Sequence, residues 1–139
     1  MLTLGEDQRL MIWDVATGQS VRDFAGKQEE ILAVAVSPDG QHLAAGCLDG
    51  WTRVWTIATG KPRCALRQPQ VPAAVAFSPD GKWFVTGGPD NYGAPELCLW
   101  SAENWQLVGR FTGPQMPVAS VVFSPDSRRL ATAGAGEQA

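Results

Sequence analysis

His42 is the first residue in this sequence whose type could do chemistry, because it is the only histidine in 139 residues. A general base must lie near a nucleophile or an acid, and the spacing around His42 implies no such partner. We therefore expect a solvent-facing turn residue and not a catalytic base.

The cysteines are the next candidates, at Cys47, Cys64 and Cys98. They are odd in number, far apart and without paired spacing, which favours buried reduced thiols over a disulfide framework or a zinc site. An enzyme using His42, Cys47 or the carboxylates would need a set of nucleophile, base and orienting group, and no such set can be assembled. We expect no catalytic, metal-binding or cofactor-binding residue.

The acidic pairs and the paired glycines do not predict a catalytic or phosphate-binding site either. Glu6-Asp7 and Glu29-Glu30 could form carboxylate dyads, but acidic residues are more common in loops. Gly87-Gly88 is not followed by a helix, so it does not predict a phosphate-binding loop.

Composition excludes several classes of protein. Hydrophobic residues make up 45% of the chain and the net charge is −3, which is typical of a soluble globular protein. The 11 basic residues are scattered and outnumbered by 14 acidic ones, so we expect no nucleic-acid partner. The amino-terminal residues lack the pattern of a signal peptide, and no apolar stretch reaches membrane-spanning length. We expect a cytoplasmic protein with no membrane partner.

An internal repeat organises the chain. The turn sequence Ser-Pro-Asp begins at positions 37, 78 and 124, in steps of 41 and 46 residues. Trp13, Trp55 and Trp100 recur in steps of 42 and 45 residues. Because periods of this length indicate repeat architectures, each unit is one structural module. The greater length of the later unit comes from an insertion within "GGPDNYGAPELCLW".

Each unit reads as four short strands joined by tight turns, with no helical periodicity. An apolar run such as "ILAVAV" comes first, followed by the Ser-Pro-Asp turn, a second strand, an acidic turn, a strand with the tryptophan, and an outer strand. Glycine ends the first two Ser-Pro-Asp turns, but Ser127 stands there in the third. If that position needs a positive φ, Ser127 is slightly strained.

The motifs that carry a family resemblance are "SPDG" at 37–40 and 78–81, "GEDQRLMIWDVATG" at 5–18, "GCLDGWTRVWTIATG" at 46–60 and "SPDSRRLATAG" at 124–134. With them the chain resembles the WD-repeat β-propeller family over nearly its whole length. The resemblance implies an all-β propeller segment of about three four-stranded blades, incomplete unless extended or oligomerised. The expected units are 1–24, the end of one blade; 31–66 and 72–111, two full blades; and 117–135, the start of a fourth.

The resemblance assigns the residues of the structural repeat. The strand tryptophan falls on Trp13, Trp55 and Trp100, the turn aspartate on Asp7 and Asp49 with Asp90 approximate, and the hydroxyl on Thr3, Thr86 and Thr132. Ala45 holds the hydroxyl position in the remaining unit. The family's Gly-His dipeptide is replaced by Gly26-Lys27, Arg67-Gln68 and Gly113-Pro114. We therefore expect that the hydrogen-bond relay from Trp through Thr and His to Asp does not form as the family builds it, and that packing holds the blades more than buried polar networks do.

Partner binding is assigned to one rim of the propeller. Trp51, Trp83 and Trp105 lie off the repeat phase; Trp51 and Trp105 either anchor an interface or pack locally. The insertion adds an aromatic loop beside the acidic turns. This loop either presents a surface for a partner or is an insertion that the fold tolerates without a function. The predicted rim contains Glu6, Leu48, Trp51 and the loop from Pro89 to Glu96 with Asp90 and Tyr92.

The function we expect is a non-catalytic scaffold for contact with a protein partner of unknown identity. The alternative is a regulatory or sensor propeller segment of a larger multidomain enzyme such as a kinase or hydrolase. Three blades are fewer than the roughly four to eight that close a propeller. We therefore expect the chain to be part of a longer propeller, or else to assemble head to tail, with two chains forming a six-bladed ring.

Overall fold

The chain forms antiparallel sheets throughout the part that the structure describes. A computed structural model describes residues 2–4, 10–24, 30–88, 96–112 and 117–134. All regular elements in these ranges are strands, which confirms the expected all-β class. They are β1 (Leu2–Leu4), β2 (Leu10–Trp13), β3 (Ser20–Phe24), β4 (Ile31–Val36), β5 (His42–Cys47), β6 (Trp51–Thr56), β7 (Pro62–Arg67), β8 (Ala74–Phe77), β9 (Trp83–Gly87), β10 (Glu96–Ser101), β11 (Leu107–Thr112), β12 (Val118–Phe123) and β13 (Leu130–Gly134).

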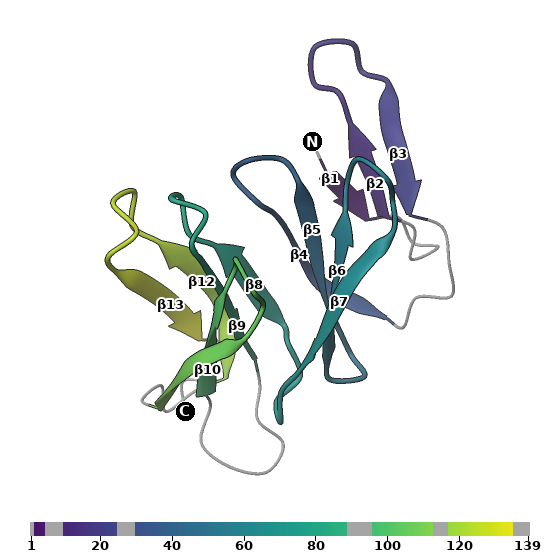
Figure 1. Cartoon of the computed structure of the whole chain (residues 1–139). Coiled ribbons are helices and arrows are strands. Elements are labelled where there is room, and N and C mark those ends of the chain that lie inside the picture. The colour runs from purple at the N-terminus through teal and green to yellow at the C-terminus, as the bar shows by residue number, and fades with distance from the viewer. Residues whose placement is uncertain (1, 5–9, 25–29, 89–95, 113–116, 135–139) are drawn as a thin grey trace.

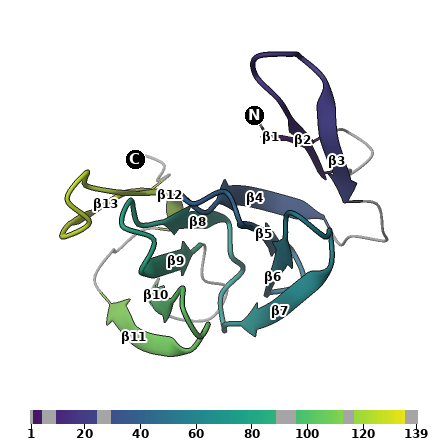
Figure 2. The ribbon, with the colours of Figure 1, turned by 45° about the horizontal axis from the view of Figure 1, so that its top comes forward.

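Four sheets follow one another along the chain (Figure 1). Their strand orders are β1-β2-β3, β4-β5-β6-β7, β8-β9-β10-β11 and β12-β13, so every strand pairs with its sequence neighbour. Strand β8 contacts both β4 and β12, which brings the first strands of three sheets together. Figure 2 shows these inner strands on one side and the outer strands β7 and β11 on the other, as in blades around a channel.

Burial differs between the strands of a blade for a simple reason. In each full blade the second strand lies between its neighbours in the sheet and has sheets on both faces, so β5 and β9 are buried over nearly their whole length. On the outer strand β7, only Leu66 is fully buried. The strand tryptophans Trp55 and Trp100 are each 6% exposed, and both lie on the third strand of a blade.

Three apolar clusters fill the spaces between successive sheets. The first joins Leu10 and Phe24 of the first sheet to Leu43 and Trp55 of the second, with the rings of Phe24 and Trp55 6.0 Å apart. The other two clusters lie at the next two interfaces between sheets and contain Ala44, Val54, Leu66, Phe84, Cys98, Trp100 and Trp105, and then Ala74, Val85, Leu97, Val118 and Val121.

The three Ser-Pro-Asp turns have the same hydrogen bonds. In the first, the Ser37 hydroxyl donates to the Asp39 carboxylate and accepts from the His42 amide, which lies 2.9 Å away. The Asp39 carboxylate also accepts from the Gln41 amide at 3.0 Å. Ser78 with Asp80 and Ser124 with Asp126 repeat this pattern. The motif is therefore a self-contained turn that aligns the first two strands of each blade.

The last position of these turns has a left-handed backbone. The φ angles are 71° at Gly40, 75° at Gly81 and 61° at Ser127. This position therefore adopts the positive φ on which the expected strain at Ser127 depended. The Ser127 hydroxyl accepts a hydrogen bond from the Asp80 amide at 3.0 Å, so the third turn is tied to the second.

Replacing Gly40 by serine should lower the free energy of unfolding by about 1–2 kcal/mol, the penalty for a side chain in the left-handed region. A Cβ at Gly40 would meet no atom within 4 Å, so conformational strain is the only expected effect. Urea denaturation followed by circular dichroism measures it, with Gly109→Ser, at a position without positive φ, as the control. Equal midpoints for the Gly40→Ser variant and the wild type would contradict this expectation.

Acid should destabilise the fold through these turns. Hydrogen bonds from Ser37, Ser78 and Ser124, and then from backbone amides, lower the pKa of Asp39, Asp80 and Asp126 below the ordinary value of 3.8. A lowered pKa in the folded state gives stability that is complete above the unfolded pKa and is lost as the pH falls through the folded pKa.

The measurement is an NMR titration of the Asp80 carboxyl group in the wild type and in Ser78→Ala. We expect its pKa to lie below 3.8 in the wild type and to rise when the serine hydroxyl is removed. The free energy of unfolding should decrease below about pH 4. An Asp80 pKa that does not change in the variant would show that the serine is not the cause.

Candidate functional site

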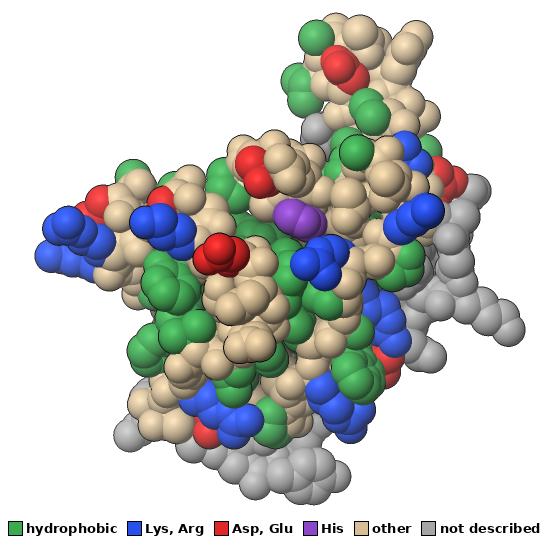
Figure 3. Space-filling view, viewed as in Figure 1, with side chains coloured by type: hydrophobic (Ala, Val, Ile, Leu, Met, Phe, Trp, Pro, Cys, Tyr) green, Lys and Arg blue, Asp and Glu red, His purple; other side chains and the backbone are tan. Residues whose placement is uncertain are grey.

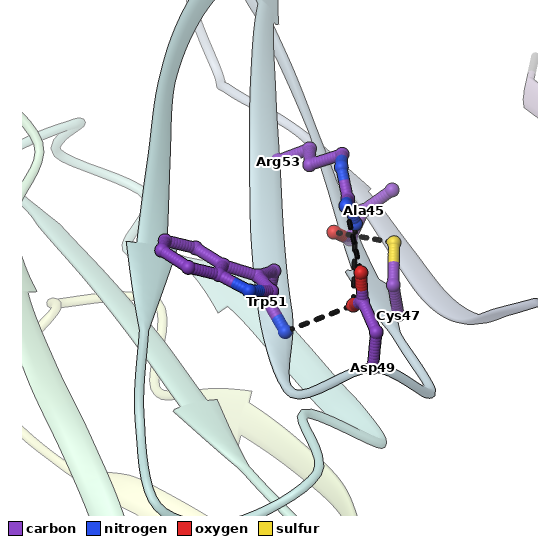
Figure 4. Close-up of polar contacts among 5 residues, drawn as sticks. All are labelled: Ala45, Cys47, Asp49, Trp51 and Arg53. Carbon is purple, nitrogen blue, oxygen red and sulfur yellow. Dashed lines mark hydrogen bonds and ion pairs between the residues drawn. The ribbon is translucent and has the colours of Figure 1, made fainter. Parts of the chain in front are cut away.

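The turn between β5 and β6 is the best described part of the predicted rim (Figure 4). The Asp49 carboxylate accepts from the Trp51 amide at 3.1 Å, and Gly50 supplies the positive φ of 85° that the turn requires. The Arg53 guanidinium donates to both Asp49 carboxylate oxygens, at 3.2 and 2.7 Å. Its hydrogen bonds lower the pKa of Asp49 and raise that of Arg53. The aspartate is therefore held ionised by a neighbour on the next strand.

Two side chains flanking this turn offer contact surface. Leu48 is 52% exposed, although it is a large apolar residue. Trp51 is half-buried, and the guanidinium carbon of Arg67 lies 5.2 Å from the centre of its ring. This distance fits a cation–π contact, which orders both side chains at the end of the sheet. Tryptophan and arginine ordered in this way are typical of binding surfaces.

A buried hydrogen-bond relay joins the two full blades. The Trp100 indole N–H donates to the Thr86 hydroxyl oxygen at 3.0 Å, and the Thr86 hydroxyl donates to the side-chain oxygen of Gln68. Gln68 follows β7 and is 5% exposed, whereas Thr86 and Trp100 belong to β9 and β10. The relay therefore fixes the connection from one blade to the interior of the next.

This shorter relay, without a histidine, corrects the expectation that packing rather than a buried polar network holds this blade. Gln68 stands where the family has histidine, and its amide oxygen accepts the threonine proton as a ring nitrogen would. In the sequence, Arg67-Gln68 marks the loss of the Gly-His dipeptide, but the glutamine amide keeps an acceptor at that position. In the preceding blade Ala45 has no hydroxyl to offer Trp55, so packing holds that tryptophan.

One further buried polar side chain, Gln70, follows Gln68 by two residues. Gln70 is 5% exposed, and its amide nitrogen donates to the Glu96 carboxylate at 3.4 Å. Glu96 also lies 3.9 Å from the Arg110 guanidinium. These contacts connect the segment after β7 with the start of β10 and the outer strand β11. No motif in the sequence distinguishes Gln70 or Arg110.

The structure decides between the two alternatives for Trp105 and corrects the expected place of His42. Trp105 occupies a hairpin position held by glycine in the other two hairpins, with a φ of 60°, and is only 7% exposed. Its ring lies edge-on to Phe77 and Phe84 and 5.4 Å from the His42 ring. His42 is the first residue of β5 and is half-buried, not a turn residue facing solvent (Figure 3, purple). Trp105 therefore packs locally between blades, and the positive φ at a bulky residue is offset by these ring contacts.

Of the other residues assigned to the repeat or to the rim, some lie within the ranges that the structure describes and others lie outside them. Trp13 is half-buried at the end of β2, Thr132 is exposed on β13, and Thr3 pairs through its backbone with Met11. Glu6, Asp7, Pro89, Asp90 and Tyr92 lie outside the described residues. The structure therefore brings together Leu48, Asp49 and Trp51 at one turn, and the contribution of the insertion stays a prediction.

The described residues contain no cluster of three or more His, Cys, Asp or Glu side chains that could hold a metal ion. All three cysteines lie within the described ranges, and none forms a disulfide. Burial raises the pKa of the Cys64 and Cys98 thiols, which keeps them protonated and poorly nucleophilic. Within the same ranges, no helix is long and apolar enough to cross a membrane.

Comparison with known proteins agrees with the repeated sheets. A family model described as "WD domain, G-beta repeat" matches residues 18–56, 64–92 and 105–137, which together are more than half of the chain. The chain belongs to the WD-repeat family. This confirms the resemblance drawn from the sequence, with about three repeats.

WD-repeat relatives match almost the whole chain. WD repeat-containing protein SL1-17 of Schistosoma mansoni is 27% identical, over 95% of this chain and 42% of that protein. Meiotic recombination protein rec14 of Schizosaccharomyces pombe is 29% identical, over 96% of this chain and 44% of that protein. Apoptotic protease-activating factor 1 of Rattus norvegicus is 28% identical, over 96% of this chain and 11% of that protein. The chain spans less than half the length of each of these relatives.

Proposed function

We propose that this WD-repeat chain is a non-catalytic scaffold that binds a protein partner through the rim formed by Leu48, Trp51 and Arg67. WD repeats support contact between proteins in general. The observation that carries the proposal is the Trp51 ring held against the Arg67 guanidinium beside a Leu48 side chain that is 52% exposed. An apolar side chain next to an ordered aromatic–arginine pair suits the desolvated centre of an interface. The insertion with Pro89, Asp90 and Tyr92, together with Glu6, extends this rim in the proposal.

Affinity capture with quantitative mass spectrometry tests the rim. The double variant Leu48→Asp, Trp51→Ala is compared with the wild type and with Val15→Asp, a control at an apolar residue that is 81% exposed in the β2–β3 hairpin. We expect one or more proteins to bind the wild type and the control equally, and to bind the rim variant roughly tenfold less or weaker still. Equal capture by all three proteins would overturn the rim assignment.

A second candidate function is a regulatory or sensor segment of a larger multidomain enzyme. The observation that favours it is the small share, 11%, of apoptotic protease-activating factor 1 that the chain covers. The genomic sequence flanking this chain distinguishes the two functions. An open reading frame continuing into a kinase or hydrolase domain would favour the regulatory segment, and a frame encoding repeats alone would favour the scaffold.

We also propose the cytoplasm as the compartment of this protein, without a nucleic-acid or membrane partner. Three cysteines without a disulfide suit a reducing compartment. Cell fractionation followed by immunoblotting tests this assignment, and recovery of the protein in a membrane or secreted fraction would contradict it.

A further inference from the structure

Three buried polar atoms near the junction of the two full blades have no hydrogen-bond partner in the described part of the chain. They are the Thr52 hydroxyl oxygen Oγ1, the Gln68 side-chain nitrogen Nε2 and the Gln70 side-chain oxygen Oε1. Thr52 is 1% exposed, and Gln68 and Gln70 are each 5% exposed, so the three atoms lie away from bulk solvent. Because an unpaired polar atom in a protein interior is costly, each of the three needs a partner.

The register of β6 and β7 places Thr52 and Gln68 as diagonal neighbours on the face turned toward the next blade. Thr52 pairs with Leu66, and opposed residues of antiparallel strands share a face. Leu66 belongs to one apolar cluster with Trp100 of the next blade, so the Thr52 side chain is turned the same way. Gln68 follows Leu66 by two residues, and its side-chain oxygen contacts Thr86 of that blade. Diagonal neighbours lie about 7–8 Å apart, a distance that one small molecule can bridge.

Gln70 contacts the next blade at a neighbouring position. Its side-chain nitrogen donates to the Glu96 carboxylate at 3.4 Å. Glu96 comes two residues before Cys98, which pairs with Thr86, so Glu96 and Thr86 are diagonal neighbours on β10 and β9. The two glutamines therefore contact adjacent positions on one face of the next blade.

The segment that joins β7 to β8 covers these residues (Figure 1). Gly46 on β5 pairs with Thr52, and a Cβ at Gly46 would lie 2.0 Å from the Pro72 carbonyl oxygen. The segment therefore passes directly against the strand beside Thr52, which accounts for the burial of the hydroxyl group.

The chemistry of the neighbouring groups fixes the orientation of both amides. An indole N–H can only donate, so Trp100 donates to the Thr86 oxygen and the Thr86 proton needs an acceptor. Gln68 supplies that acceptor with its oxygen, which leaves its nitrogen turned away from Thr86. A carboxylate can only accept, so Gln70 offers its nitrogen to Glu96 and its oxygen is turned away. The two amides thus present one donor and one acceptor, and the threonine hydroxyl on β6 can act as either.

We propose that these three atoms bind one ordered water molecule, which accepts from Gln68 Nε2 and Thr52 Oγ1 and donates to Gln70 Oε1. A metal cation cannot accept from the amide N–H, and an anion cannot donate to the amide oxygen, whereas water does both. Buried waters typically make about three hydrogen bonds to groups that would otherwise be unsatisfied. The relay that begins at Trp100 then continues through the water to β6 and joins the interiors of the two full blades.

A high-resolution crystal structure of the full chain tests the site directly. We expect a single peak of electron density within about 3.2 Å of Thr52 Oγ1, Gln68 Nε2 and Gln70 Oε1. No density, or density that contacts only one or two of these atoms, would overturn the proposal. Contacts of about 2.3–2.6 Å to the two oxygens would indicate a metal ion and would overturn it as well.

A double-mutant cycle tests whether the water couples two residues that do not bond to each other. Thr52→Val keeps the shape of the side chain without the hydroxyl, and Gln70→Leu removes the amide oxygen. We expect each change to raise the unfolding equilibrium constant roughly tenfold or more, and the double variant to fall roughly fivefold short of their product. Thr56→Val, on the same strand, replaces Thr52→Val in the control cycle, where the effects should multiply.

Effects that multiply in both cycles would overturn the proposal, and the crystal structure decides if a variant does not fold. The residues of the proposed rim are unchanged in every variant, so the outcome leaves the proposed function unaffected.

Discussion

Replacing Trp100 by alanine is expected to lower the free energy of unfolding by about 3–5 kcal/mol, enough to unfold most of a marginally stable domain. The side chain is 6% exposed and belongs to the cluster between the two full blades with Val54, Phe84 and Trp105. Alanine would leave a cavity there and remove the N–H donor that contacts Thr86 at 3.0 Å. Trp55→Ala should have a similar effect, because Trp55 is also 6% exposed.

Guanidinium denaturation followed by far-ultraviolet circular dichroism measures this effect. Trp100→Phe is the matched control: it keeps a large ring but cannot donate to Thr86, and we expect a loss of about 1–3 kcal/mol. Trp13→Ala should be milder than Trp100→Ala, because Trp13 is half-buried. If Trp55→Ala and Trp100→Ala both leave the midpoint unchanged, the interpretation of the strand tryptophans as packing anchors is wrong.

Replacing Gly88 by alanine should destabilise the fold by about 3 kcal/mol or more, at the upper end of overpacking effects. A Cβ at Gly88 would lie 1.7 Å from the Val71 carbonyl oxygen and 2.9 Å from the Ala73 amide nitrogen. Both are backbone atoms, which cannot rotate away as a side chain can. Gly46→Ala should act similarly, since its Cβ would lie 2.0 Å from the Pro72 carbonyl oxygen.

Gly109→Ala is the matched control for these close contacts. Gly109 lies on β11, and a Cβ there would meet no atom within 4 Å, so we expect a change within about 0.5 kcal/mol. Thermal unfolding by circular dichroism compares the three variants. Equal melting temperatures of Gly88→Ala and Gly109→Ala would contradict this expectation. They would show that the segment between the blades moves to accommodate the new methyl group.

These glycines show which glycine positions the local sequence can explain and which it cannot. Gly40 and Gly81 end Ser-Pro-Asp turns, and their positive φ follows from turn chemistry within four residues. Gly46 and Gly88 lie at the ends of second strands, where nothing nearby in the sequence requires glycine. Glycine is required at these two positions because the segment from Val71 to Ala73, which connects the blades, packs against both of them. A side chain is excluded by atoms that only the folded arrangement brings close.

The candidate site also has some features that follow from the sequence and others that depend on the folded structure. The positions of Leu48, Asp49 and Trp51 at one turn follow from the repeat phase, because a tight turn between short strands keeps sequence neighbours together. The stacking of Arg67 on Trp51 was not predicted, since it depends on the pairing of β6 with β7. The bidentate ion pair of Arg53 with Asp49 depends on side-chain rotamers that no sequence pattern specifies.

The sequence by itself determined the repeat period, the all-β class, the family and the Ser-Pro-Asp turns, because each rests on hydrogen bonds and apolar alternation among residues close along the chain. Tertiary structure alone decided that Gln68 accepts from Thr86 and that Trp105 packs between His42 and Phe84. The Gln68–Thr86 and His42–Trp105 contacts join residues 18 and 63 positions apart, across the boundary between two blades. Side chains so far apart meet only after the blades stack, so the packing between sheets sets their roles.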